Sequence, residues 1–113
     1  MIVVKVWGLP MLGGNKLKEI FKEVVESLSS VWDTGVQNER DVLILFPTDM
    51  MVYGLGMEVL VEIDGHSTNH LTVSQEELVT GGVGRVIKKH VPDANVAVVI
   101  STFNERNRAM WAS

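Results

Sequence analysis

The sequence contains no cysteine among its 113 residues. This absence excludes disulfides, thiolate nucleophiles and cysteine metal sites together, and it is typical of a cytoplasmic protein, the location that we expect here. Long hydrophobic runs are missing as well, since no apolar stretch approaches the roughly 20 residues that a membrane helix needs. The first residues are apolar, but Lys5 and Gly8 interrupt them, without the basic start and unbroken apolar run of a signal peptide. The sequence therefore predicts no membrane partner.

Clustered positive charge is also scarce. Ten Lys and Arg residues against 14 Asp and Glu residues give a formal net charge of −4. Nucleic-acid binding needs a basic face, whereas the two short basic clusters, at residues 16–22 and 88–90, are patterned like the solvent side of a helix. We therefore expect no nucleic-acid partner. The hydrophobic fraction of 46% suffices for one core at this length, which predicts a single domain over residues 1–113.

Residue patterns in the first half predict a strand, a helix and a second strand. Residues 2–7 are β-branched and aromatic, and residues 41–46 form a near-continuous apolar run that Pro47 ends. Between them, apolar side chains from Leu17 to Trp32 repeat at helical spacing. We expect this helix to begin at Asn15, because asparagine is a favourable N-cap residue.

The second half repeats this plan. Residues 57–64 alternate between apolar and polar side chains, and residues 95–101 form a last apolar strand. A capping box at residues 74–77 is expected to begin the helix between them, and Pro92 to end it. The predicted fold is therefore an α+β domain, in which two tandem β-α-β units form a four-stranded mixed sheet with two helices on one face.

One face of this predicted sheet is left without a helix. Such a patch is large for a soluble monomer, and its burial between subunits would stabilise an oligomer by about 25 cal/mol per Å². We therefore predict that the chain associates with itself. Alternation assigns to this face Val3, Lys5, Trp7, Glu58, Leu60, Glu62 and Asp64, with either Leu43 and Leu45 or Val42, Ile44 and Phe46, and either Ala97 and Val99 or Val96, Val98 and Ile100.

The two tandem units, and the ending of residues 95–100 followed by a polar turn and a tryptophan, resemble the tautomerase superfamily. This superfamily includes 4-oxalocrotonate tautomerase, 5-carboxymethyl-2-hydroxymuconate isomerase and macrophage migration inhibitory factor (MIF). The similarity is strongest over residues 57–111. The resemblance implies a homotrimer whose sheets line a central barrel. It also implies a catalytic N-terminal proline, often beside arginines that hold a carboxylate substrate.

The sequence departs from this pattern at the catalytic position, because it begins Met1-Ile2. A bulky second residue should block removal of Met1, so the expected terminus is a primary amine, which titrates at about 7.7–8.0 when unperturbed. The arginine that the family carries early in the second strand of a unit falls near Leu43 or Ala97, and neither can bind a carboxylate. We therefore expect a divergent member without proline-dependent tautomerase activity.

The candidate site residues for an active enzyme are Met1, with its amine as base, and the tail residues Arg106, Arg108 and Trp111. In tautomerase-like trimers this tail region lies near the N-terminal pocket, where an arginine could hold an anion bidentately. The alternative to a ligand-binding role is that Trp111 packs against a neighbouring subunit and so holds the tail in place. Three functions stay open: a protein of unassigned role without the catalyst, an isomerase, tautomerase or related lyase acting on a small keto acid, and a ferredoxin-like module. Each leaves room for a small anionic metabolite as partner.

No metal and no cofactor are predicted. His66 and His70 follow Asp64, but they lie in a loop, where a four-residue spacing imposes no common face. The run Gly81-Gly82-Val83-Gly84 is like a phosphate loop only in composition, because its amides already serve a helix. A glycine inside a helix costs about 1 kcal/mol against alanine. We expect the compensation to be a close approach of this helix to the sheet or to a neighbouring chain.

Overall fold

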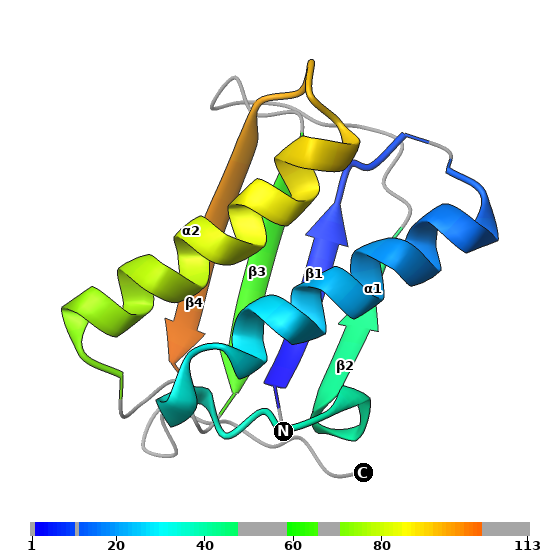
Figure 1. Cartoon of the computed structure of the whole chain (residues 1–113). Coiled ribbons are helices and arrows are strands. Elements are labelled where there is room, and N and C mark those ends of the chain that lie inside the picture. The colour runs from blue at the N-terminus through cyan, green and yellow to red at the C-terminus, as the bar shows by residue number, and fades with distance from the viewer. Residues whose placement is uncertain (1, 11, 48–58, 66–70, 103–113) are drawn as a thin grey trace, which may run out of the picture.

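The computed structural model describes residues 2–10, 12–47, 59–65 and 71–102, which form one sheet with both helices on the same face (Figure 1). The order along the chain is β1 (Ile2–Trp7), α1 (Gly14–Ser29), β2 (Val42–Leu45), β3 (Val59–Gly65), α2 (Val73–His90) and β4 (Val96–Thr102). Two short 3-10 helices, η1 (Trp32–Thr34) and η2 (Glu39–Asp41), connect α1 to β2.

The strands lie in the order β2-β1-β3-β4. β1 pairs with β2 in parallel and β3 pairs with β4 in parallel, while β1 and β3 join the two halves antiparallel. Each helix therefore connects two adjacent parallel strands, which confirms the predicted fold of two tandem β-α-β units. The pairing differs from the split arrangement of ferredoxin-like folds, in which another strand lies between the two strands of a unit. The ferredoxin-like alternative is therefore not the fold of this chain.

The hydrophobic core lies between the sheet and the two helices. On α1, Ile20, Val24 and Leu28 follow one another at four-residue spacing and are fully buried, so they form one stripe against the sheet. Every second residue of the central strands points to the helix side of the sheet, because strand side chains alternate. Full burial of each such side chain contributes about 1.5–3 kcal/mol. The strand residues concerned are Ile2, Val4, Val6, Val59, Val61 and Ile63.

The glycines of α2 allow it to approach the sheet closely, as the sequence predicted, and also to approach α1, which the sequence did not predict. A Cβ atom at Gly82 would collide with Oγ of Ser27 on α1. A Cβ atom at Gly84 would lie 3.3 Å from a methyl group of Val98 on β4, tighter than ordinary contact. These two glycines lie where α2 meets α1 and β4, so the structure explains the loss of helix propensity at both.

Helix α1 begins and ends differently from the prediction. Its N-cap is Gly13 rather than Asn15, and no side chain caps it. It ends at Ser29, where the chain turns into η1. The buried hydroxyl of Thr34 donates to the carbonyl oxygens of Leu28 and Val31, at 2.8 and 2.9 Å. The same two carbonyl oxygens accept from the backbone amides of Val31 and Thr34, so the Thr34 hydroxyl adds to the hydrogen bonds that hold the turn after α1.

Helix α2 also begins earlier than predicted. The capping box is formed by Thr72 and Gln75, not by Ser74 and Glu77: the Thr72 hydroxyl accepts from the Gln75 amide, and the Gln75 side chain accepts from the Thr72 amide. The Gln75 side chain also donates to Asp33 of η1. These two residues are far apart in the sequence, and the fold brings them into contact. Leu78 is 59% exposed although it is apolar, because the buried stripe of α2 runs along Val79, Val83 and Ile87 and Leu78 lies outside it.

Where the structure describes them, the ends of β2, β3 and β4 differ from the prediction by one residue. Asp41 belongs to η2, where its carboxylate accepts from the amides of Gln37 and Asn38, so β2 begins only at Val42. β3 begins at Val59, and residues 57 and 58 lie outside the described part of the chain. None of the described helices is both long and apolar enough to cross a membrane.

Candidate functional site

The sheet face turned away from the helices exposes large apolar side chains. Leu43 is 46% exposed, Leu45 40% and Val99 45%. Their neighbours Val42 and Ile44 pack instead into or against the core, as do Val96, Val98 and Ile100. The structure thereby decides the alternatives left open by the sequence: Leu43 and Leu45 of β2, and Ala97 and Val99 of β4, are the residues without a helix above them.

Polar side chains lie in the middle of this uncovered face. In the register of β1 and β3, Lys5 is opposite Glu62 and Val3 is opposite Asp64. The indole N–H of Trp7 donates to Glu62 Oε1 at 2.7 Å, which holds this carboxylate in place on the sheet. Atom Oδ1 of Asp64 is buried and has no hydrogen-bond partner among the described residues. The face therefore combines an apolar rim with a central cation and two carboxylates.

This composition restricts what can cover the face. An unpaired buried carboxylate costs several kcal/mol, so a covering surface has to supply donors or cations to Glu62 and Asp64, or leave them wet. Lys5 already offsets part of the charge across the strand pair, since opposite charges on paired strands contribute about 0.2–1 kcal/mol. The apolar residues Leu43, Leu45 and Val99 supply the contact area.

The predicted site residues lie outside the described part of the chain. This holds for Met1, for Arg106 and Arg108, and for Trp111. Ile2 is described: it is 1% exposed and pairs with Val42 and Gly65, so β1 is anchored in the centre of the sheet from its first described residue.

The histidine pair, which the sequence did not predict as a metal site, is not described either. His66 and His70 both fall within residues 66–70. Over the described residues, no group of three or more His, Cys, Asp or Glu side chains could hold a metal ion.

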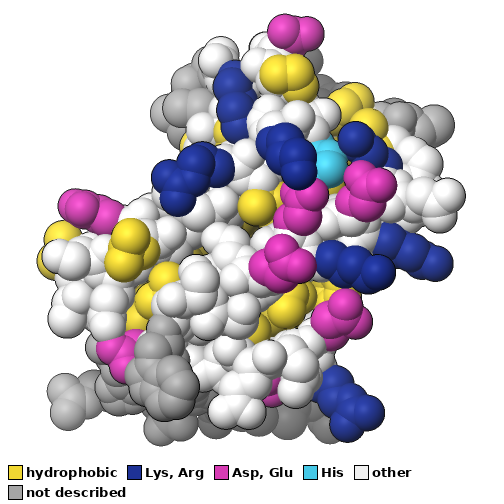
Figure 2. Space-filling model, viewed as in Figure 1, with side chains coloured by type: hydrophobic (Ala, Val, Ile, Leu, Met, Phe, Trp, Pro, Cys, Tyr) yellow, Lys and Arg dark blue, Asp and Glu magenta, His cyan; other side chains and the backbone are white. Residues whose placement is uncertain are grey.

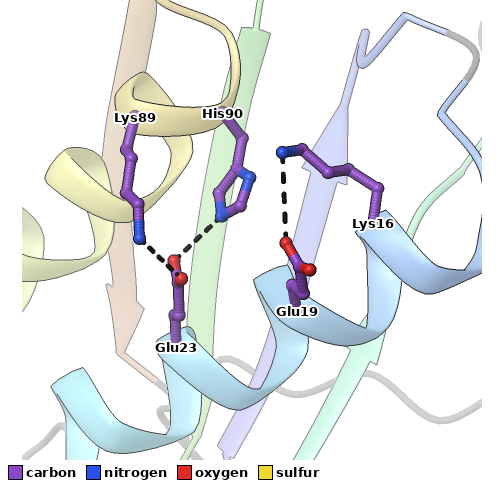
Figure 3. Close-up of polar contacts among 5 residues, drawn as sticks. All are labelled: Lys16, Glu19, Glu23, Lys89 and His90. Atoms are coloured by element: carbon purple, nitrogen blue, oxygen red, sulfur yellow. Dashed lines mark hydrogen bonds and ion pairs between the residues drawn. The ribbon is translucent and has the colours of Figure 1, made fainter.

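A second polar cluster fastens α2 to α1 on the helix face. Figure 2 shows basic and acidic side chains along this seam, and Figure 3 shows Lys89 and His90 pointing toward Glu23. Lys89 Nζ lies 2.8 Å from Glu23 Oε1, and His90 Nε2 lies 2.9 Å from Glu23 Oε2. The hydrogen bond from Lys89, followed by that of His90, lowers the pKa of the Glu23 carboxyl. The same carboxylate raises the pKa of Lys89.

The sequence predicted that residues 88–90 lie on the solvent side of the helix. His90 does not lie there. Its side chain is only 3% exposed, and its Nδ1 atom is buried with no hydrogen-bond partner among the described residues. Nε2 faces the Glu23 carboxylate, and Nδ1 is turned toward the interior. The ring therefore joins the two helices and has no free nitrogen for chemistry at the surface.

Both clusters depend on contacts that sequence reasoning missed. Trp7 and Glu62 are 55 residues apart, and Glu23 and His90 are 67 apart. Alternation did place Trp7 and Glu62 on the same sheet face. Their contact also requires the register between β1 and β3, and no local pattern specifies that register.

Comparison with known proteins identifies the fold. No protein-family model matches the sequence, and no curated protein matches it. Solved structures do match, although sequence identity is low. A fused 4-OT wild-type asymmetric trimer aligns over 96% of this chain and 91% of its own, with 11% identity and a TM-score of 0.70.

Two further structures carry the same arrangement. Malonate semialdehyde decarboxylase aligns over 97% of this chain and 91% of its own, with 11% identity and a TM-score of 0.66. A MIF-like protein from Entamoeba histolytica aligns over 99% of this chain and 95% of its own, with 13% identity and a TM-score of 0.64. The chain therefore has the fold of the tautomerase superfamily, with its four-stranded mixed sheet and two helices on one face.

Proposed function

We propose that residues 1–113 form one domain that assembles as a homotrimer through the uncovered sheet face, and that this protein lacks proline-dependent tautomerase activity. The observation that carries the proposal is the exposure of Leu43, Leu45 and Val99 on one continuous side of the sheet. Water contact with these side chains is unfavourable, and a second sheet face would remove it. The fused 4-OT structure, which has the same fold, is a trimer.

The residue before β1 supports the second half of the proposal. Malonate semialdehyde decarboxylase was solved also as a variant that replaces a proline at its first position by alanine. In this sequence the residue before Ile2 is a methionine. A methionine at this position cannot supply the secondary amine on which the superfamily's usual chemistry depends. We infer that the domain has kept the assembly and lost that catalyst.

Light scattering coupled to size-exclusion chromatography tests the assembly. The unmodified protein at micromolar concentration should have the mass of three chains. Leu43→Asp and Val99→Asp place a charge on the two outer strands of the uncovered face, and each should shift the protein toward smaller species, because a buried unpaired carboxylate costs several kcal/mol.

Leu78→Asp provides the matched control. Leu78 is 59% exposed on α2, away from the uncovered face, so the same substitution should leave the mass unchanged. A monomeric unmodified protein, or a trimer that survives both face variants, would contradict the proposed interface.

An enzyme of altered mechanism is the second candidate, because malonate semialdehyde decarboxylase with this fold has decarboxylase and hydratase activities. In this candidate the amine of Met1 is the base, Arg106 or Arg108 holds a small keto acid, and Trp111 walls the site. Intact mass spectrometry establishes whether Met1 is retained. Direct assays with enolisable α-keto acids then decide: a rate that Arg106→Ala or Arg108→Ala lowers supports the enzyme, whereas no turnover supports the first proposal.

A further inference from the structure

A groove lies between α2 and β4, on the helix side of the sheet. Its cavity has a volume of about 690 Å³, within the range of about 300–1,000 Å³ that is typical of small-molecule sites. The uncovered face lies on the opposite side of the sheet, so the proposed trimer interface does not account for this groove.

The groove exists because of the glycines of α2. Gly81 and Gly84 are among its lining residues, so over this stretch the helix presents backbone rather than side chains. Gly84 also lets the helix approach β4, since a Cβ atom there would lie 3.3 Å from Val98. Packing does not explain the glycine at position 81, because a Cβ atom there would meet nothing closer than 3.7 Å. The loss of helix propensity at Gly81 therefore has no compensation from close packing.

The walls of the groove differ in character. Arg85 and Lys88 supply positive charge, and none of the described lining residues is acidic. Val96 and Val98 of β4 form an apolar wall. In Figure 2, Lys and Arg side chains flank the left side of the upper half of the molecule, where α2 passes over β4. This is a local concentration of positive charge on a chain whose net charge is −4.

The two cations are engaged differently. Lys88 Nζ donates to the carbonyl oxygen of Ala94 and so holds the turn before β4. Arg85 forms no ion pair with any described residue, and its Nη1 atom lies over Gly81, 3.7 Å from where a Cβ atom would be. The neighbouring Lys89 pairs with Glu23 on the other side of the helix. Arg85 is therefore the guanidinium available to an anion in the groove.

We propose that this groove binds a small organic carboxylate, with its carboxylate on Arg85 and Lys88 and its apolar body against Val96 and Val98. A guanidinium binds a carboxylate through two parallel N–H···O bonds, which fixes orientation as well as charge. The site is independent of the proposed trimerisation and of the tail residues predicted from the sequence.

An NMR titration of the ¹⁵N-labelled protein tests the proposal with benzoate, benzamide and inorganic phosphate as probes. Benzoate should shift the amide signals of Gly81, Gly84 and Val98. Benzamide keeps the apolar body without the charge, and phosphate keeps the charge without the apolar body. Each should bind about tenfold more weakly than benzoate, because each loses one of the two walls.

Arg85→Gln should also weaken benzoate binding about tenfold. Arg40→Gln makes the same change at an exposed residue of η2 outside the groove and should leave binding unchanged. Thermal unfolding confirms that both variants fold. Equal binding of benzoate and benzamide, equal binding of benzoate and phosphate, equal losses in the two variants, or shifts elsewhere would each overturn the proposal.

Discussion

Three glycines in one helix offer a direct test of the packing described for α2. Replacing any of them by alanine gains about 1 kcal/mol of helix propensity, so differences among the variants report the surroundings. At Gly81 the added methyl group meets only ordinary contact, at 3.7 Å. At Gly84 it meets Val98 at 3.3 Å. At Gly82 it meets the Ser27 hydroxyl, which can rotate, while the Cβ atom of Ser27 lies 3.6 Å away.

These contacts give a different expected result for each variant. Gly81→Ala should raise the free energy of unfolding by about 1 kcal/mol. Gly84→Ala should leave it unchanged or lower it, because overpacking costs about 1–3 kcal/mol and offsets the gain. Gly82→Ala should gain less than Gly81→Ala in the unmodified protein. It should recover the full 1 kcal/mol or so when Ser27→Ala has removed the hydroxyl.

Urea unfolding at one fixed subunit concentration measures these differences, since association of the chains contributes to apparent stability. A double-mutant cycle of Ser27→Ala and Gly82→Ala isolates the coupling between α1 and α2 from the helix propensity of each substitution. If Gly81→Ala and Gly84→Ala have equal effects, or if the cycle shows no coupling, the close approach of α2 to its neighbours is not what selects glycine there.

Two further changes test the helix ends and the seam between the helices. Thr72→Ala should cost about 1 kcal/mol in unfolding free energy, because Thr72 caps α2, whereas Ser74→Ala inside the first turn should cost little; equal losses would contradict the observed capping box. Glu23→Gln should destabilise the protein most at neutral pH, as measured by unfolding over a pH series. The pKa of Glu23 is lowered from its ordinary 4.5, so its contribution is present above that pH and is lost as the pH falls through the folded value. The pKa of Lys89 is raised from 10.5, so its contribution is lost only as the pH rises beyond that value. A stability difference that does not shrink at acid pH would contradict the ion pair.

The helix ends show why local rules were only partly successful. Both Ser74 and Thr72 are good N-cap residues, and each is followed three positions later by a residue that can complete a capping box. The choice of Thr72 coincides with a contact outside the helix, between Gln75 and Asp33 of η1. Leu78 is apolar and yet exposed, because the stripe that packs in the core is Val79, Val83 and Ile87.

The candidate sites, too, were predicted in part by local patterns and in part required the tertiary structure. Alternation along β1 and β3 predicted that Lys5, Trp7 and Glu62 share a face, because side-chain direction in a strand is a local property. The hydrogen bond between Trp7 and Glu62 required the register of two strands that are far apart in the sequence. The basic cluster at residues 88–90 was predicted as one solvated face. Lys88 and Lys89 are exposed as predicted, although they contact Ala94 and Glu23, whereas the side chain of His90 is buried against Glu23.

The sequence by itself determined the order of the elements, the tandem β-α-β plan and the presence of an uncovered sheet face, because these follow from periodicity and chain connectivity. The tertiary structure alone decided which residues of β2 and β4 face outward, how Glu23 joins the two helices, and that Gly81 and Gly84 open a groove beside Arg85. These features depend on register and on the distance between packed elements. Such quantities arise from long-range contacts, which no short stretch of sequence encodes.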